Sequence, residues 1–166
     1  IQPSQADAET VGFTIGPRLN AAGRMDHASL ALKLLLAETM DEARALAQEL
    51  ERCNRARQDA TKAMMATAER LVAEERMGAW PMQVVWHPEW SPSLVGLVAG
   101  KLMERSGRPV VAIGKHGANW IGSGRSPKAF DVTEAMRRAG DGILTRVGGH
   151  VQACGFEDSG GIDRCT

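Results

Sequence analysis

The sequence Gly122-Ser-Gly-Arg-Ser-Pro127, followed later in the chain by Gly148-Gly-His150, contains the residue types of an anion-binding site. Glycines flank Ser123 and allow the backbone to approach a ligand closely, while Arg125 adds a planar guanidinium that suits phosphate. The second stretch has paired glycines, which permit positive φ angles and convergent amide N–H groups. His150 adds a donor that gains charge near neutral pH. We predict that phosphate is bound by Ser123, Gly124, Arg125, Ser126, Gly148 and Gly149.

Each stretch taken alone is also compatible with an ordinary turn, because short glycine-rich matches are common by chance. The charge between the two stretches favours binding. The whole chain has a net charge of zero, but residues 101–150 contain nine Lys/Arg against four Asp/Glu. No carboxylate occurs from Arg105 to Phe130. A locally positive surface is what a phosphate-bearing ligand requires, although exposed lysines and arginines are usually only solvated.

The composition is that of a soluble globular protein, with 43% hydrophobic and 24% charged residues in a chain of 166. Cys53, Cys154 and Cys165 have neither metal-type spacing nor an even number for a disulfide framework, which fits a reducing, cytoplasmic environment. No apolar run approaches the length of a membrane span. The chain begins with Ile1 in a polar stretch, and we expect it to be part of a longer protein.

The first forty residues contain a second group of candidate ligands. Residues 1–12 are polar and expected to be poorly ordered, and Gly16-Pro17 and Gly23 predict a loop or irregular turn over 13–24. The loop residues either tie this segment to a neighbouring domain or bind phosphate. A leucine-rich segment at 28–37 predicts a short, well-buried helix. The phosphate candidates here are Arg18, Asn20 and Arg24.

A long helix is predicted from Asp41, as its N-cap, to Met77, because apolar residues recur at helical spacing without Gly or Pro. Its length of roughly 55 Å exceeds the core of a small domain and indicates a connector. Arg57 lies on a basic face that is either solvated or in contact with a nucleic-acid backbone. We therefore divide the chain into the end of a preceding domain at 1–40, an interdomain helix at 41–78, and a substrate-binding domain at 79–166.

The last part of the chain predicts a small α/β domain with a mixed sheet. Short β-type runs alternate with helical periodicity, and Asp131 is suited to cap the second helix. The expected strands are 82–86, 109–113, 119–122 and 153–157, and the expected helices are 93–106 and 131–139.

Several kinds of catalytic site are not predicted by the sequence. The four histidines show no HxxxH or HxH spacing, and Asp26-His27 is interpreted as a polar helix start. Gly122-Ser-Gly-Arg-Ser126 does not match a nucleophile elbow, and neither a Walker loop nor a dinucleotide fingerprint occurs. On its residues alone, the chain is better suited to bind phosphates than to break bonds.

The chain resembles the RecJ family of bacterial single-stranded-DNA-specific exonucleases along nearly its whole length. Gly16-Pro-Arg-Leu-Asn-Ala-Ala-Gly-Arg24, followed by a long helix with Asn54-Arg-Ala-Arg-Gln58, carries the first half of the resemblance. Arg108-Pro109, Gly122-Ser-Gly-Arg-Ser126 and Gly148-Gly-His-Val-Gln-Ala153 are similar to the DHH-associated domain of that family. The fold implied is a connector helix followed by a DHH-associated α/β domain.

This resemblance implies 5′→3′ hydrolysis of single-stranded DNA in DNA repair and recombination. Two metal ions, Mn²⁺ or Mg²⁺, would be held in a preceding DHH domain, so we expect no metal ligands here and no activity from the chain alone. Arg125, Ser123 and Ser126 would grip DNA phosphates, and Gly149 and His150 would lie near the reacting phosphate, with His150 as the catalytic candidate. Implied partners are single-stranded DNA, single-strand-binding protein and a helicase, and the implied oligomeric state is a monomer.

One loop departs from the family pattern. The family has Trp-His-Pro-Gly-Val where this chain has Trp90-Ser-Pro-Ser-Leu94, so Ser91 and Ser93 replace a histidine and a glycine. His87 lies in a similar context four residues earlier. Two other functions stay open: a phosphodiesterase acting on short oligonucleotides or cyclic dinucleotides, and a non-catalytic interaction module.

Overall fold

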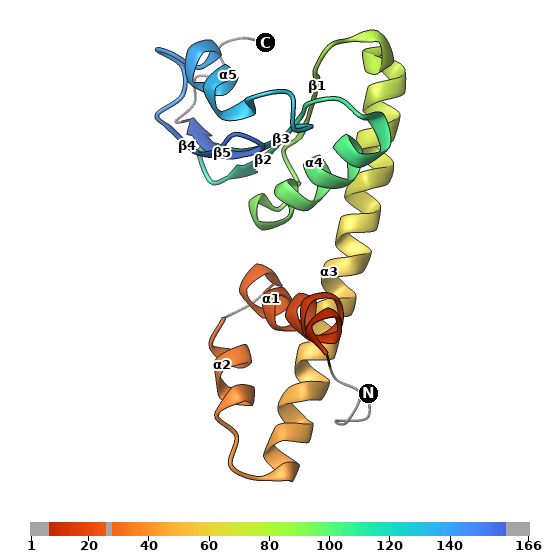
Figure 1. Ribbon diagram of the computed structural model, residues 1–166, viewed down its shortest axis with the longest axis vertical. Helices are drawn as coiled ribbons and strands as arrows, with labels where there is room; N and C mark the ends of the chain where they lie inside the picture. Colours follow the sequence, from red (N-terminus) through yellow and green to blue (C-terminus); the bar gives the residue numbers. More distant parts are fainter. Residues whose placement is uncertain (1–6, 26–27, 159–166) are drawn as a thin grey trace. The chain divides into compact units, whose positions relative to one another are not determined.

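The computed structural model describes residues 7–25 and 28–158. Asp26, His27 and Cys165, which entered the sequence interpretation, lie outside these ranges. The chain divides into two compact units, Ile1–Ala60 and Thr61–Thr166, here called the N-terminal and C-terminal units. Figure 1 shows the course of the chain through each. No helix in the described ranges is long and apolar enough to cross a membrane.

The segment at 13–24 is helical, so the prediction of a loop was wrong. A π-helix, η2 (Thr10–Ile15), leads directly into α1 (Gly16–Met25). Pro17 lies in the first turn of α1, where a missing N–H and a fixed φ are tolerated. Gly23 falls near the end of the helix. The two breakers therefore stand at helix positions that accept them.

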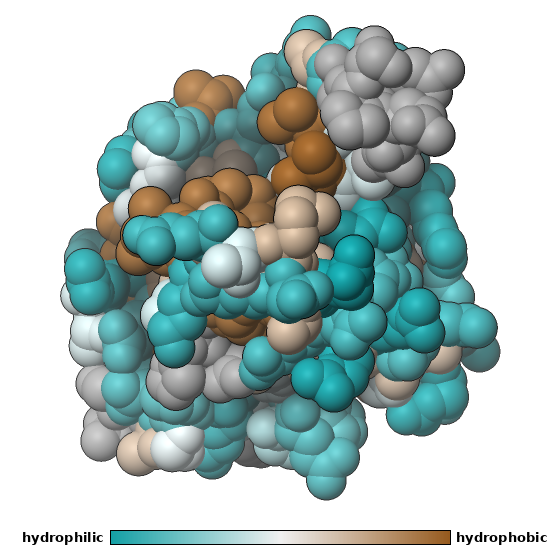
Figure 2. Space-filling model, turned by 90° about the horizontal axis from the view of Figure 1, so that it is seen from below, coloured by the Kyte–Doolittle hydropathy of each residue, from teal (hydrophilic) through white to brown (hydrophobic). Residues whose placement is uncertain are grey.

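The helix α2 (Ser29–Leu35) is far less buried than its leucines predicted. Leu30 packs with Ala22 and Leu50 in a small core, but Leu35 and Leu36 are 66% and 68% exposed. Figure 2 shows that hydrophobic residues, in brown, are exposed between hydrophilic residues, in teal, on this face of the molecule. Within the N-terminal unit, then, α2 buries Leu30 and leaves Leu35 and the adjoining Leu36 exposed.

The long helix α3 (Met40–Glu74) begins one residue before the predicted cap. The backbone N–H of Glu42 donates to the Thr39 hydroxyl at 3.3 Å, so Thr39 occupies the capping position. Asp41 lies instead in the first turn, where its negative charge favours the helix dipole. Beyond the helix, Arg76 takes a left-handed φ of 53°. The boundary between the two units falls inside this helix.

The C-terminal unit is built around a five-stranded mixed sheet with the order β1-β2-β3-β5-β4. β1 and β2 are parallel and joined through α4 (Pro92–Ser106), and all other pairs are antiparallel. The predicted α/β class with a long helix and a small mixed sheet is confirmed. The remaining elements are η3 (Met77–Ala79), β1 (Gln83–His87), β2 (Val110–His116), β3 (Asn119–Arg125), α5 (Val132–Ala139), β4 (Arg146–His150) and β5 (Ala153–Asp158).

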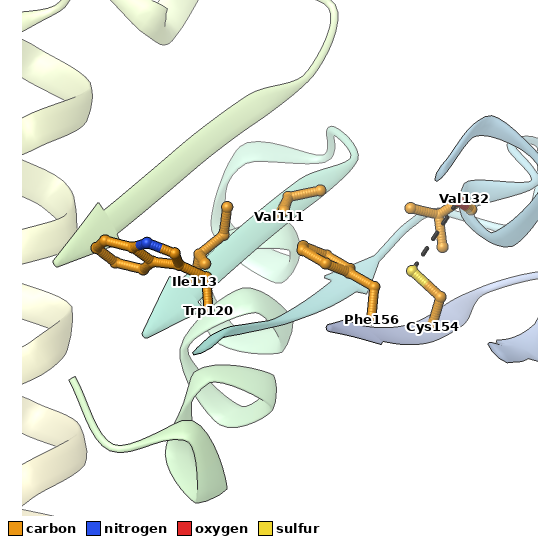
Figure 3. Close-up of a cluster of buried hydrophobic side chains, with 6 residues drawn as sticks. All are labelled: Val111, Ile113, Trp120, Val132, Cys154 and Phe156. Atoms are coloured by element: carbon orange, nitrogen blue, oxygen red, sulfur yellow. Dashed lines mark hydrogen bonds between the residues drawn. The ribbon is translucent and has the colours of Figure 1, made fainter. Parts of the chain in front are cut away.

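Helices cover the two faces of this sheet unequally. α4 packs on β2 and β3 on one face, here called the α4 face, and α5 packs toward β3, β4 and β5 on the other (Figure 1). As predicted, Asp131 caps α5 by accepting from the N–H of Glu134 at 2.9 Å. Figure 3 shows the main hydrophobic cluster on the α5 face, formed by Val111, Ile113, Trp120, Val132, Cys154 and Phe156.

Candidate nucleic-acid interface

Ser123 and Arg125 lie on β3 rather than in a glycine-rich loop, because the strand extends three residues beyond its predicted end at Gly122. Alternate residues of a strand share a face, so both side chains project on the same side. That side is the α4 face: a Cβ built on Gly96 of α4 would lie 3.1 Å from Arg125 Nη2 and 3.3 Å from Ser123 Oγ. α4 therefore passes close to the Ser123 hydroxyl and the Arg125 guanidinium at Gly96.

The glycines that flank Ser123 serve the opposite face. A Cβ on Gly122 would lie 2.0 Å from Phe156 Cζ, and one on Gly124 would lie 2.6 Å from Cys154 Sγ. Their small size makes room for the α5-face core. The expectation that they let a ligand approach the backbone is therefore not needed to explain them.

Hydrogen bonds hold the Arg125 guanidinium in a defined place. Arg125 Nη1 donates to Ser123 Oγ and to the Gly124 carbonyl, both at 2.7 Å. Ser123 Oγ in turn donates to the Cys154 carbonyl at 3.0 Å. These bonds to the neutral oxygens of Ser123 and Gly124 orient the guanidinium on the α4 face. A pre-oriented, charged fork is suited to a phosphate oxygen.

The second predicted motif, at Gly148–His150, forms the edge strand β4 and not a turn. Its register places it beside the first: Arg125 pairs with Ala153, and Ala153 pairs with His150. His150 is exposed and, two strands across from Arg125, lies about 10 Å away along the same row. The sheet therefore brings together the two sequence motifs, with β5 between them.

Gly149 is the position in this motif that requires glycine. Its φ is 151°, and a Cβ would lie 2.2 Å from the Ala153 carbonyl oxygen. Gly148, in contrast, has no positive φ and open space around it. The Thr133 hydroxyl donates to the His150 carbonyl, which ties the end of β4 to α5. The backbone around His150 is thus fixed from two sides.

Ser126 is placed differently from the other candidates. It is 2% exposed, and its hydroxyl donates to the Phe130 carbonyl at 2.7 Å. Its N–H donates to the Gln152 carbonyl at 3.1 Å. These bonds commit Ser126 to shaping the loop after β3, and they place its hydroxyl inside the fold and away from the open surface beside Arg125.

In the N-terminal unit, Arg18 is already neutralised. Its Nε forms an ion pair with Glu51 Oε2 at 2.8 Å, and its Nη1 donates to the Thr14 carbonyl at 2.7 Å. The hydrogen bond from Arg18, followed by that from Arg55, lowers the pKa of the Glu51 carboxyl. Arg18 therefore joins α1 to α3 within the N-terminal unit.

Arg24 and Arg57 are brought close to each other in the same unit. Burial, and after it the positive charge of Arg24, lowers the pKa of the Arg57 guanidinium. Arg57 Nη2 donates to Asn54 Oδ1 at 2.9 Å, and Asn54 is only 2% exposed. Asn20 is exposed on α1. Two neighbouring guanidiniums of like charge favour an anion between or beside them.

The comparison with known proteins identifies the domain in which these residues lie. The family model described as the DHHA1 domain matches residues 77–160. The chain belongs to the DHHA1 family. This region contains the whole sheet, so Ser123, Arg125 and His150 are DHHA1 residues.

The relatives in which this DHHA1 domain is found support the resemblance to RecJ. The chain is 36% identical over 161 residues to the single-stranded-DNA-specific exonuclease RecJ of Salmonella typhimurium and 38% identical over 154 residues to that of Bacillus subtilis. Those matches cover 93% and 92% of this chain but only 28% and 19% of the relatives. The chain thus spans 19% to 28% of the length of these two curated relatives.

Solved structures give the same result. The crystal structure of RecJ from Thermus thermophilus in complex with Mn²⁺ matches with a TM-score of 0.80 and 38% identity, over 92% of this chain and 22% of that chain. A structure of exonuclease RecJ bound to manganese matches with a TM-score of 0.79 and 33% identity, over 98% of this chain and 40% of the other. The predicted RecJ resemblance is confirmed.

The polar side chains of the loop that departs from the RecJ pattern form hydrogen bonds within the loop itself. Ser91 Oγ and Ser93 Oγ are 2.8 Å apart at the start of α4. His87 Nδ1 accepts from the N–H of Glu89 at 3.2 Å, and its ring lies 6.2 Å from that of Trp90. The imidazole of His87 therefore organises its own turn.

The DHHA1 domain and the rest of the described chain do not fit a two-metal centre. Over residues 7–25 and 28–158, no group of three or more His, Cys, Asp or Glu side chains converges on a possible ion. We therefore assign no step of a reaction to a metal held by these residues.

Sequence reasoning missed two residues that share the α4 face with the candidates. Gly155 on β5 pairs with both Ser123 and Gly148, and Arg146 stands four residues before His150 on β4. A period of two counted back from His150 would have indicated Arg146. Gly155 carried no comparable pattern, because its importance depends on pairing between distant strands.

Proposed function

We propose that this chain supplies the substrate-phosphate-binding part of a 5′→3′ exonuclease that hydrolyses single-stranded DNA. The observation that carries the proposal is the placement of Ser123, Arg125 and His150 on one face of the sheet, with Arg125 and His150 in register across β5. The RecJ relatives, whose printed name describes a single-stranded-DNA-specific exonuclease, support the choice of substrate.

In this proposal each side chain has a distinct role. The Arg125 guanidinium binds a phosphate oxygen, and Ser123 keeps it oriented. His150 donates a hydrogen bond to the charge that develops on the reacting phosphate, which is the electrostatic contribution expected of a catalytic residue. Gly149 keeps the backbone beneath that phosphate in place. Arg24 and Arg57 form a second basic site in the N-terminal unit.

In the whole protein, Mn²⁺ or Mg²⁺ would activate the attacking water, as the metal-bound RecJ structures suggest. The ligands for that metal would lie outside the described residues. The chain by itself would then bind DNA without cleaving it. A cytoplasmic location, a monomeric state, a role in DNA repair and recombination, and pairing with single-strand-binding protein and a helicase stay predictions from the RecJ resemblance.

The first test is the affinity of the 166-residue chain for a 5′-phosphorylated single strand of about 20 nucleotides, longer than most single-strand sites, across a salt series. Arg125→Ala should weaken binding and flatten the slope of log K against log salt by about 0.7, the value for one phosphate contact on a single strand. Arg138→Ala, on exposed α5, is the matched control and should leave the slope unchanged. An unaltered slope in Arg125→Ala would remove Arg125 from the phosphate site.

The second test concerns His150 and requires the whole protein. His150→Ala should lower the turnover of single-stranded DNA by about 10²-fold or more, with little change in affinity. Wild-type turnover in this variant would contradict its position beside the reacting phosphate. A preference of the wild-type enzyme for dinucleotides over long strands would instead favour the short-oligonucleotide phosphodiesterase.

A further inference from the structure

The end of β4 and the turn that follows it are held by hydrogen bonds from one short segment of the chain. Three consecutive backbone carbonyls, at positions 150, 151 and 152, each accept from a donor between residues 126 and 133. The donors, in that order, are the Thr133 hydroxyl and the backbone N–H groups of Val132, at 2.9 Å, and Ser126, at 3.1 Å. The segment that directly follows Arg125 therefore holds the turn that begins at His150.

Thr133 differs from the other two donors because it acts through its side chain. A backbone N–H group is supplied by every residue except proline, whereas a hydroxyl at this position depends on the residue type. Threonine hydroxyls within helices commonly donate to a carbonyl of their own helix, as Thr67 does to the Ala63 carbonyl at 3.3 Å. Thr133, in the first turn of α5 and 3% exposed, donates to β4 instead.

The direction of the His150 side chain depends strongly on its backbone. β4 is an edge strand of the sheet, and four of its five residues are exposed, His150 among them. Directly before His150, Gly149 has a φ of 151°, which turns the chain away from regular strand geometry. Since little of the imidazole is enclosed by neighbouring side chains, a contact that fixes the His150 carbonyl also fixes where the ring points.

We propose that Thr133 is a positioning residue for His150: its hydroxyl sets the direction in which the imidazole meets the reacting phosphate. The inference rests on the proposed function, because it takes the role of His150 from there. Thr133 acts from the opposite face of the sheet, where α5 packs, and is not in contact with the substrate. Such a contact affects the rate because a misplacement of about 1 Å in a catalytic group can cost about 10²-fold.

The test measures the turnover of single-stranded DNA by the whole protein with its divalent metal. Thr133→Val removes the hydroxyl and keeps the branched shape, so it should lower kcat about tenfold with KM nearly unchanged. Thr133→Ser keeps the hydroxyl and should retain most of kcat. Thr133→Ala adds no apolar group and should show the same loss as the valine variant, which keeps the test valid if that variant misfolds.

Thr145→Val is the matched control. The Thr145 hydroxyl also donates to a backbone carbonyl, that of Glu157 at 2.9 Å, where β4 begins and β5 ends. Its removal weakens the same pair of strands at the end away from His150. It should therefore leave kcat unchanged, and a tenfold loss in this variant would assign the effect of Thr133 to the general stability of the two strands.

A double-mutant cycle shows whether Thr133 acts through His150. In a His150→Ala background, Thr133→Val should cause no further loss of kcat, because the imidazole that it positions is gone. A tenfold loss in both backgrounds would overturn the inference. Wild-type kcat in Thr133→Val, where His150→Ala has lost turnover, would overturn it as well.

The imidazole resonances of His150, measured by NMR in the 166-residue chain, give a result that does not depend on activity. They should shift in Thr133→Val and keep their positions in Thr133→Ser and Thr145→Val. Unshifted resonances in Thr133→Val would contradict the inference. If His150→Ala keeps wild-type turnover while Thr133→Val shifts these resonances, Thr133 does position the imidazole, and it is the proposed role of His150 that fails.

Discussion

The two units of this chain bury their hydrophobic side chains to very different degrees. In the C-terminal unit, helices lie on both faces of a sheet, and residues such as Val111 and Phe156 are almost fully enclosed. In the N-terminal unit, a small cluster around Leu50 is buried while Leu35 and Leu36 stay exposed. The comparison teaches that a leucine-rich helix is stabilised by its unit only where a second layer exists to cover it.

The arginines of the two units differ in a parallel way. Arg18 in the N-terminal unit is paired with the Glu51 carboxylate, so its charge serves the fold. Arg125 in the C-terminal unit donates to the neutral oxygens of Ser123 and Gly124, and these bonds orient its guanidinium on the sheet. A guanidinium held by uncharged acceptors is therefore the better candidate for binding phosphate.

The largest expected contrast is in stability. Phe156→Ala should destabilise the C-terminal unit by about 3–5 kcal/mol, because it empties the middle of the α5-face core. Leu35→Ala should change stability by less than about 0.5 kcal/mol, since the side chain is exposed. Urea unfolding followed by tryptophan fluorescence measures the first, since all four tryptophans lie beyond residue 60. Hydrogen exchange measures the second. Equal losses of stability in the two variants would show that the two units do not differ in how much these side chains contribute to folding.

A smaller contrast concerns thiol reactivity. Burial raises the pKa of the Cys154 thiol, and Cys154 is 3% exposed, whereas Cys53 on α3 is half-buried. In a Cys165→Ser background at pH 8, Cys154 should react with iodoacetamide much more slowly than Cys53. Each 1.4 kcal/mol of opening free energy slows the reaction about tenfold. Similar rates for the two thiols would mean that the C-terminal unit opens as readily as the N-terminal one.

The smallest effect should come from the Arg18–Glu51 pair. The pKa of Glu51 is lowered in the folded chain from its ordinary value of 4.5, so its contribution is fully present above pH 4.5 and is lost as the pH falls through the lower folded value. Glu51→Gln should therefore lower the thermal midpoint slightly at pH 7 and not at all at pH 2. A midpoint difference that persists at pH 2 would assign the effect to packing instead of charge.

Much of the fold was predictable from local patterns. Two helices and four of the five strands between residues 82 and 158 follow from local patterns, and the position of Asp131 alone predicts its role as a cap. The edge strand β4 is not predicted by the sequence. The cap of α3 was misplaced by two residues, from Thr39 to Asp41, because both residue types favour that position. Pro17 was interpreted as a breaker because its place in the first turn depends on where the helix starts.

What could not be predicted depends on residues far apart in the sequence. In the sequence, Gly122 and Gly124 indicate a ligand-binding loop. In the structure, Phe156 and Cys154 pack against these two glycines, which explains their small size. Arg125 on β3 and His150 on β4 come near each other because β5 pairs with both strands. Strand order of this kind leaves no mark in a single sequence. The candidate residues could therefore be named from the sequence, and they stay predictions, whereas their backbone setting could not be predicted.

The central position of β5 also has a consequence for the order of folding. β2 and β3 join through a two-residue turn at Gly117, and β4 and β5 through another after His150, so both hairpins are local and form early. The docking of β5 onto β3 closes a loop of nearly thirty residues, from Arg125 to Ala153, and we expect it to be slower than the formation of either hairpin. Until that step is complete, the guanidinium of Arg125 and the imidazole of His150 belong to separate hairpins. We therefore expect the proposed phosphate site to form only after both hairpins, so that a state containing the two hairpins undocked would not bind DNA there.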